Sequence, residues 1–397
     1  MDDDHTAANG RDRNERTAMH EAAPTRTYRI APDALHGWAR TLLAALGSNE
    51  REAGLTADHL VGANLAGHDS HGIAMLPTYV DSCLAGHLRL NRTVESVVDT
   101  GAMLVVDGGL GMGQSLAHQA MTMLIERARE HGIALLGLRN AHHIGRIGHW
   151  AEMAIEAGFV GIHFTNAMTE RPVVAPYGGN EARFVTNPFT VGIPRADDEP
   201  LLLDFATSAI AHGKARVAMH AGKPVPEGTL VDAEGCPTTD PNTLFADPAG
   251  ALRTFAGHKG HALAIVCELL GAALIGGVTG RDVHLPGKPG VVNNMLAIVF
   301  DPARLGTGAS FERETAGFVD WVRSARLDEV GEALGGVLMP GEPERRSRAA
   351  RAGAIPLDAG TMAELARAAR EAGGRDGRTS SVPDPHALAE SEETRER

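Results

Sequence analysis

Residues 103–113, MLVVDGGLGMG, begin with a short apolar run and end in a glycine-rich turn. Residues 115–130 follow with the alanine, methionine, leucine, glutamate and arginine content that is typical of a helix. Residues 133–138 and 160–164 are two more short apolar runs, and residues 148–157 between them have helical character. This alternation of strand and helix predicts an α/β fold.

The same pattern extends along the chain in both directions. Residues 31–66 carry apolar side chains at helical spacing, and Asn49 with Glu52 predicts a capping box. The expected later segments are residues 201–203, 264–275 and 296–300, followed by helices at residues 311–326 and 361–372.

Helices at both ends of an α/β middle predict one helical domain that is built from both chain ends, here residues 28–100 and 312–372. Residues 101–311 then form the α/β domain. Residues 1–27 and 373–397 are polar and aperiodic, so we expect disordered tails there.

Composition excludes several classes of protein. The 397 residues carry a net charge of −13, which disfavours nucleic acid and acidic membrane surfaces as partners. No run approaches the ~18 uninterrupted apolar residues of a membrane span, and the first thirty residues contain no secretory signal. Cys83, Cys236 and Cys267 form no CxxC pair, which favours the reducing cytoplasm.

The glycine turn does not match a Rossmann fingerprint. Its spacing is GxGxG, and Gln114 closes the pattern. The next strand runs into Arg139 and Asn140, where a Rossmann domain needs an acidic residue. We therefore predict a tight turn.

Two histidine clusters are candidates for chemistry. Residues 68–72, HDSHG, can form a metal site, a proton-transfer unit or a polar capped turn. Residues 140–150 lie at a predicted strand-to-helix turn, where a pyrophosphate or carboxylate would fit, although an ordinary loop has the same pattern.

Two further charged residues follow or precede apolar segments. Asp204 directly follows three leucines and can bind ribose, orient a histidine or cap a helix. Lys259 precedes an apolar helix, where it can meet phosphate or simply be solvated. Neither HExxH, GxSxG nor a P-loop is present, so we expect no metal and no hydrolase or nucleotide triphosphatase site.

Taken together, these motifs resemble a known family. In order, DSHG at residue 69, residues 140–148, TNP at 186, LDFATS at 203, HKG at 258 and MPGE at 339 are similar to the malate/L-lactate dehydrogenase family, most of all to its hydroxycarboxylate dehydrogenase branch. The resemblance covers residues 28–372. It implies a non-Rossmann fold with a large mixed β-sheet, a homodimer, and NAD or NADP as cofactor.

The resemblance also implies site residues. The cofactor contacts carried over to this chain are His71, Gly145, Arg146, Ile147, Leu202, Leu203, Asp204, Phe205, Ala206, His258, Lys259, Asn293, Gly341 and Glu342. Hydride transfer at a secondary alcohol needs a proton acceptor with a pKa near working pH, which suits imidazole. His71 and His143 are both candidates; we favour His71, oriented by Asp204 or Asp69.

The substrate residues define the expected specificity. Many members of the family carry arginine where this chain has Met75, so Arg146 or Arg183 is expected to bind the substrate carboxylate, with Ser70 nearby. Met75 would form an apolar wall for an aromatic or larger aliphatic 2-oxo acid. The alternatives are a cyclic imino acid reductase, an inactive binding protein and a metal-dependent hydrolase.

Overall fold

The computed structural model describes residues 26–195, 198–220, 222–282, 290–374 and 382–389. The predicted N-terminal tail lies almost wholly outside these residues. Residues 382–389, in contrast, do not behave as the predicted disordered tail: the carbonyl of Pro383 accepts a 2.7 Å hydrogen bond from Trp38 Nε1. Val382 and Leu388 pack against the helical core, which the polar composition around them concealed.

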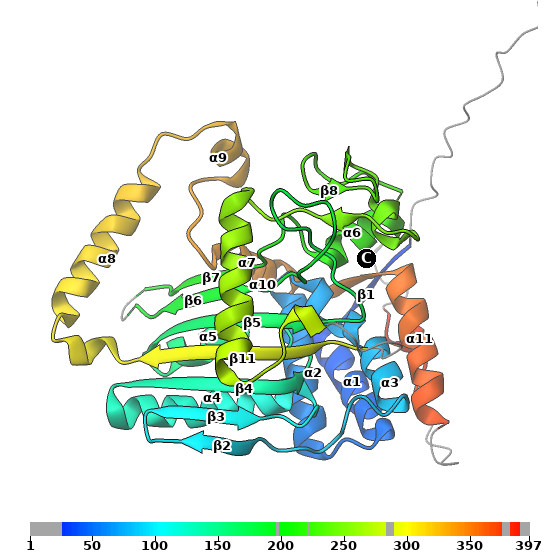
Figure 1. The fold of residues 1–397 in the computed structure, drawn as a ribbon, viewed down its shortest axis with the longest axis horizontal. Helices are drawn as coiled ribbons and strands as arrows, with labels where there is room; N and C mark the ends of the chain where they lie inside the picture. Colours follow the sequence, from blue (N-terminus) through cyan, green and yellow to red (C-terminus); the bar gives the residue numbers. More distant parts are fainter. Residues whose placement is uncertain (1–25, 196–197, 221, 283–289, 375–381, 390–397) are drawn as a thin grey trace, which may run out of the picture.

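A seven-stranded mixed sheet forms the centre of the molecule, in the order β2-β3-β4-β11-β5-β6-β7 (Figure 1). Only β3 and β4 pair in parallel. This topology confirms an α/β fold without a Rossmann sheet. The strands are β2 (Glu95–Asp99), β3 (Met103–Asp107), β4 (Ile133–His142), β5 (Val160–Met168), β6 (Phe189–Ile193), β7 (Leu201–Phe205) and β11 (Val292–Phe300).

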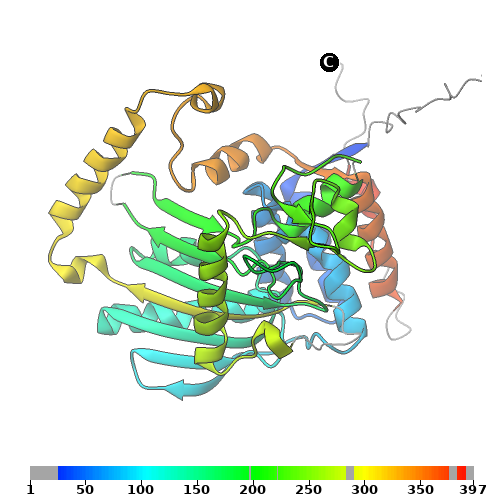
Figure 2. The ribbon, with the colours of Figure 1, turned by 45° about the horizontal axis from the view of Figure 1, so that its top comes forward.

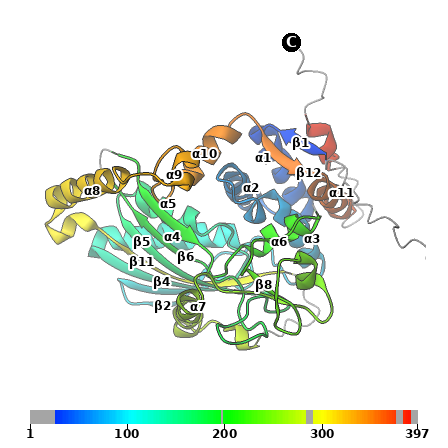
Figure 3. The same cartoon turned by 90° about the horizontal axis from the view of Figure 1, so that it is seen from above.

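Helices cover the sheet on both faces (Figure 3). On one face lie α4 (Gly113–His131) and α5 (Gly148–Glu156), which bury Leu116 and Trp150 against the strands. On the other face lies α7 (His258–Gly271). By length and mean hydropathy the stretch His258–Ile275 could cross a membrane, but it is interrupted by charged residues, and here it covers the sheet and buries Cys267.

Both ends of the chain build a helical lobe beside the sheet, which confirms that prediction. It consists of α1 (Pro32–Leu46), α2 (Glu50–Leu65), α3 (Leu76–Leu84), α10 (Glu342–Arg351) and α11 (Ala359–Gly373). An antiparallel pair, β1 (Thr27–Ile30) with β12 (Ile355–Asp358), ties the two ends together. Residues from both ends share one hydrophobic core.

Two other parts flank this body. The helix α8 (Gly308–Arg323) lies at the far side of the sheet from α1 and α11, and α9 (Glu329–Leu334) lies next to α10, although residues 312–372 were expected to be helical domain throughout (Figures 1 and 3). A small subdomain lies beside the lobe (Figure 2). It contains α6 (His212–His220), β8 (Leu230–Val231), β9 (Pro237–Thr238) and β10 (Ala251–Leu252).

Local predictions differ from the structure at two places. Asn49 caps α2 by accepting from Glu52 N at 2.9 Å, but the Glu52 carboxylate binds Ser48 and Asn91 and does not complete the box. Residues 139–143 were predicted as loop, and residues 139–142 instead extend β4. Arg139 and Asn140 find side-chain partners at the sheet end, for example Arg139 with Asp107 at 2.8 Å.

Candidate active site

The glycine turn before α4 lets that helix begin against the end of β4. A Cβ at Gly113 would lie 2.1 Å from the His142 carbonyl oxygen, so no side chain fits there. The preceding loop is held by Gly108 N, which donates to Arg139 O at 2.8 Å. The predicted tight turn is therefore confirmed, and it places Gln114 beneath the end of β4.

Two imidazoles meet at this end of the sheet. His71 lies on a short 3-10 turn after α2, and His143 directly follows β4. Nδ1 of His71 is 3.2 Å from Nε2 of His143, and the two rings stack with an interplanar angle of 13°. The structure thus brings together both histidines that the sequence left as candidates.

A tyrosine and a glutamine continue this contact into the interior. Tyr79 Oη lies 2.6 Å from His143 Nδ1, and the Gln114 amide lies 2.6 Å from Tyr79 Oη. Both side chains are buried. Sequence reasoning missed them: Tyr79 has the spacing of a core residue of α3, and Gln114 was noted only for breaking a glycine pattern.

Burial keeps these groups neutral. It lowers the pKa of His71 to about 4, with added effects from the positive charges of His68 and Arg146. Burial also lowers the pKa of His143 well below its usual range and raises that of Tyr79 above its own. A chain of neutral hydrogen-bonding groups therefore leads from Gln114 to His71, the only one of the four that is not fully buried.

The carboxylates predicted to orient His71 are engaged elsewhere. Asp69 pairs with Arg351 at 2.7 Å and accepts from Asn64. Asp204 accepts from Gly148 N and from Thr190 Oγ1, both at 2.9 Å. The predicted contact to His71 is wrong for both residues, and His143 occupies that position.

Arg146 belongs to a buried ion cluster. Its guanidinium is 2% exposed, bonds the Glu152 carboxylate and lies 3.7 Å from Asp204. Glu152 also pairs with Arg348 at 2.8 Å. A substrate carboxylate would have to displace two carboxylates already present, so the structure does not support the predicted substrate contact of Arg146.

At the turn before α5, where a pyrophosphate or carboxylate was expected to fit, the structure places the Asp204 side chain. Gly148 N, at the start of α5, donates to Asp204 Oδ2. Gly145 in the same turn has φ +77°, and a Cβ there would lie 2.0 Å from His59 Nε2. His59 in turn accepts from Arg146 N at 2.8 Å.

Most predicted cofactor residues converge on the edge strand β7. Asp204 links it to the turn at residues 145–147, and Leu202 N donates to Pro340 O at 3.1 Å, next to Gly341. Phe205 packs on Phe255, which precedes the exposed His258 and Lys259 at the start of α7. Asn293 bonds the Ile144 backbone at 3.0 Å and so supports the same turn.

The edge of β7 is partly open to solvent. Because β7 ends the sheet, one side of its backbone is not covered by another strand. Leu203 offers 39% of its surface to solvent as an apolar platform, and Gly341 has φ +88°, which keeps the adjoining turn free of a side chain. Three other predicted cofactor residues differ in what they offer: Ala206 offers backbone polar groups, and Glu342 and Lys259 carry charged side chains.

The predicted substrate residues are less closely grouped. Ser70 lies against α6, where a Cβ at Gly213 would be 2.4 Å from Ser70 Cβ. Met75 is half-buried and packs against the helical core. Arg183 is exposed and bonds Glu181, so its guanidinium is accessible in a way that Arg146 is not.

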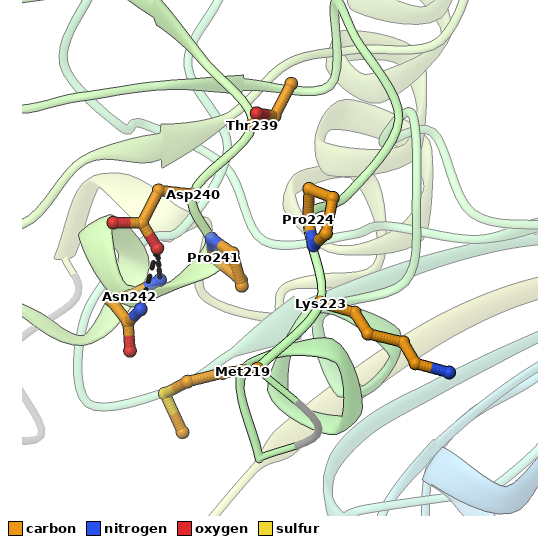
Figure 4. Close-up of a pocket in the computed structure, with 8 residues that line it drawn as sticks. Met219, Lys223, Pro224, Thr239, Asp240, Pro241 and Asn242 are labelled. Atoms are coloured by element: carbon orange, nitrogen blue, oxygen red, sulfur yellow. Dashed lines mark hydrogen bonds between the residues drawn. The ribbon is translucent and has the colours of Figure 1, made fainter. Parts of the chain in front are cut away.

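A separate small cavity, about 240 Å³, lies between the end of α6 and residues 239–242 (Figure 4). Its lining includes Met219, Lys223 and Asp240 and none of the predicted site residues. Among the described residues, no three histidine, cysteine, aspartate or glutamate side chains are grouped to hold a metal.

The mixed sheet, the two-ended helical lobe and the histidine pair define a non-Rossmann α/β dehydrogenase. Comparison with known proteins agrees: the malate/L-lactate dehydrogenase family model matches residues 30–366, and the chain belongs to that family. It is therefore an oxidoreductase of the dehydrogenase type.

Individual relatives cover nearly the whole folded chain. Hydroxycarboxylate dehydrogenase B of Escherichia coli K12 is 47% identical over 348 residues, 87% of this chain and 95% of the relative. A Δ1-pyrroline-2-carboxylate/Δ1-piperideine-2-carboxylate reductase of Pseudomonas putida is 37% identical over 76% of this chain and 85% of its own length. A solved E. coli structure of the malate/lactate dehydrogenase group aligns with a TM-score of 0.84 and 45% identity, over 89% of this chain and 98% of that one.

Proposed function

We propose that this protein is an NAD-dependent 2-hydroxy-acid dehydrogenase that also works as a 2-oxo-acid reductase. The observation that carries the proposal is the histidine pair: His71 Nδ1 is held by His143, which leaves Nε2 for a reacting oxygen. Residues 145–147 follow His143 closely in the chain, and Asp204 of β7 bonds Gly148 N directly after them. Family membership supplies the reaction class.

The chain's own groups handle the proton. In the oxidative direction, His71 Nε2 accepts the hydroxyl proton of the substrate; in the reductive direction it returns a proton to the carbonyl oxygen. The nicotinamide, when bound, supplies or takes the hydride. The low pKa of buried His71 favours the neutral base, which suits oxidation, and a bound substrate carboxylate would favour the protonated form.

The cofactor would be held by the edge of β7, the turn at residues 145–147, the turn at Gly341 and the start of α7. We favour NAD over NADP because Glu342 places a carboxylate at the Gly341 turn. A carboxylate accepts from ribose hydroxyls and repels a 2′-phosphate. Saturation with NADH at lower concentration than NADPH would support this choice.

For the substrate, we propose a 2-oxo acid with an aromatic or larger aliphatic side chain. Met75 supplies an apolar wall, Ser70 lies beside His71, and Arg183 is the accessible guanidinium for the carboxylate. Malate preferred over phenylpyruvate-like acids would contradict the apolar wall.

We further propose a homodimer in the cytoplasm. The outer face of α7 exposes Ile265 and Leu269, and α8 with α9 exposes Phe318 at 62% and Trp321 at 70%. Surfaces this apolar favour burial against a second copy. Cys236 and Cys267 are free thiols, which suits a reducing compartment.

The test is the absorbance of reduced nicotinamide during incubation with a panel of 2-oxo acids and cyclic imino acids. Oxidation of NADH with an oxo acid supports the proposal. Turnover only with cyclic imino acids would establish the alternative that the P. putida relative represents, because a histidine can protonate nitrogen as well as oxygen. Cofactor binding without any turnover would indicate a binding protein.

A further inference from the structure

We infer that Tyr79 and Gln114 are positioning residues for His71, acting through His143, which they hold with Nδ1 protonated and Nε2 free to accept. The inference rests on the proposed function, because it concerns the proton step of that reaction. It assigns a chemical role to two residues that neither the sequence motifs nor the expected cofactor contacts include.

The contacts form one unbranched chain. Gln114 meets the Tyr79 hydroxyl at 2.6 Å, that hydroxyl meets His143 Nδ1 at 2.6 Å, and His143 Nε2 meets His71 Nδ1 at 3.2 Å. Tyr79 is 0% exposed, Gln114 1% and His143 5%. The chain therefore opens toward solvent and substrate only at His71.

The direction of the hydrogen bonds follows from what His71 must do. It gives and takes a proton at Nε2, so Nδ1 must keep its proton in both states. If Nδ1 instead accepted from His143, neutral His71 could give up its Nε2 proton only by becoming an imidazolate. His71 Nδ1 therefore donates to His143 Nε2, and His143 Nδ1 donates to the Tyr79 oxygen.

The Tyr79 hydroxyl then has to donate to Gln114. A 180° flip of the Gln114 side-chain amide puts Oε1 where Nε2 lies now, next to the Tyr79 hydroxyl. Among the described residues, Gln114 Oε1 has no other hydrogen-bond partner. Gln114 can thus accept from the phenol. A glutamine is suited to end such a chain because its amide neither gains nor loses a proton at working pH.

The chain orients His71 and does not conduct protons. Burial raises the pKa of Tyr79, so the phenol keeps its proton and does not pass it on. In reduction, the N–H bond at His71 Nε2 breaks and an O–H bond forms at the C2 oxygen as the carbonyl carbon receives the hydride. The imidazolium thereby becomes neutral imidazole, still donating from Nδ1.

The test begins with Tyr79→Phe, which removes the hydroxyl and keeps the ring. We expect kcat to fall about tenfold, with the substrate KM and the cofactor Kd nearly unchanged, because the hydroxyl is remote from both. Loss of the acceptor for His143 Nδ1–H destabilises the His71 imidazolium. The limb of the kcat–pH profile that belongs to His71 should therefore move to lower pH.

Other groups that face His71 are unchanged in this variant: His68 on its own turn, Arg146 after β4 and His59 on α2. Tyr28→Phe, the same substitution elsewhere in the helical lobe, is the matched control and should leave kcat and its pH profile as in the wild type. Gln114→Met should shift the profile in the same direction as Tyr79→Phe, whereas Gln114→Glu, which still accepts from the phenol, should not. A limb that moves to higher pH, or does not move, would overturn the inference.

A measurement without substrate separates this inference from the proposed function. In protein labelled with ¹⁵N-histidine, the His143 ring, assigned by comparison with His143→Gln, should show a protonated Nδ1 and an unprotonated Nε2. A proton on Nε2 would overturn the inference even if the enzyme were active. If the wild type turned over no oxo acid, the proposed function would be wrong. The tautomer of His143 could still be determined from the ¹⁵N spectrum in that case.

Discussion

The His71 chain and the Arg146 cluster lie on either side of the same Gly145 turn, yet they are built in opposite ways. The chain is neutral, and it ends at an imidazole nitrogen that no protein group occupies. The cluster is charged, and its guanidinium is enclosed by Glu152 and Asp204. Both regions carry residue types that a sequence search associates with active sites.

The difference shows how a polar group becomes available for chemistry. A group reacts when its surroundings fix its orientation but leave one atom unsatisfied, as His143 does for His71. A group whose every charge is matched by a neighbour stabilises the fold instead. Activity and stability should therefore respond separately to substitutions in the two regions.

The substitution His71→Ala is expected to give the largest difference between the effect on activity and the effect on stability. Loss of the acid/base group should reduce kcat by a factor on the order of 10² or more, within the range of general acid–base catalysis. The thermal midpoint of unfolding and the cofactor Kd should change little, because His71 is half-buried and is the last side chain in the hydrogen-bonded row. Steady-state kinetics with thermal unfolding provides the measurement; near wild-type turnover would remove His71 from the mechanism.

The substitution Arg146→Leu should lower the stability of the fold more than it lowers kcat. Removing the guanidinium leaves Asp204 without this cation and leaves Glu152 dependent on Arg348, so the loss should be at most the about 3–5 kcal/mol of comparable buried pairs. Urea unfolding would measure this loss. Arg183→Leu is the matched control: its ion pair is exposed, so stability should change by less than about 0.5 kcal/mol, while KM rises if Arg183 binds the substrate carboxylate.

The sequence predicted more of the fold than of the site. Short-range patterns located the helices at residues 31–66, the glycine turn and the central strands, because periodicity and turn chemistry are local. The strand end at residues 139–142 was missed, since the Arg139 and Asn140 side chains bond Asp107, and the Asn140 backbone N–H donates to Asn294, only in the tertiary structure.

The site depended on contacts between distant segments. Sequence reasoning identified His71 and His143 but could not show that they touch, because 72 positions separate them. It gave His71 a carboxylate partner by analogy with common acid/base pairs, whereas the structure provides a second imidazole. Tyr79 and Gln114 carry no local signal at all, since a buried tyrosine on a helix looks like core until its hydroxyl partner is known.

A smaller effect should come from the turn that separates the two regions. Gly145→Ala combines left-handed strain with a clash at His59, so we expect a loss of more than 1 kcal/mol in unfolding free energy together with weaker cofactor binding. Gly158→Ala isolates the strain, because φ is +83° there and nothing lies within 4 Å of the new Cβ. Equal losses in the two variants would mean that the clash with His59 is relieved by a small shift.

Acid sensitivity should come from the buried histidines, and the loss of stability should accumulate gradually as the pH falls. Burial lowers the pKa of His163 to about 4, below its ordinary 6.5, so the unfolded chain binds a proton that the folded chain does not between these values. Stability is therefore lost as pH falls from about 6.5 toward 4, by about 1.4 kcal/mol per pH unit for one such histidine. Urea unfolding at several pH values gives the unfolding free energy as a function of pH. The slope of this curve should be smaller in His163→Gln than in the wild type, by the equivalent of about one proton. Arg183→Leu should give a curve parallel to the wild type, because its ion pair is exposed and a guanidinium keeps its charge throughout this range.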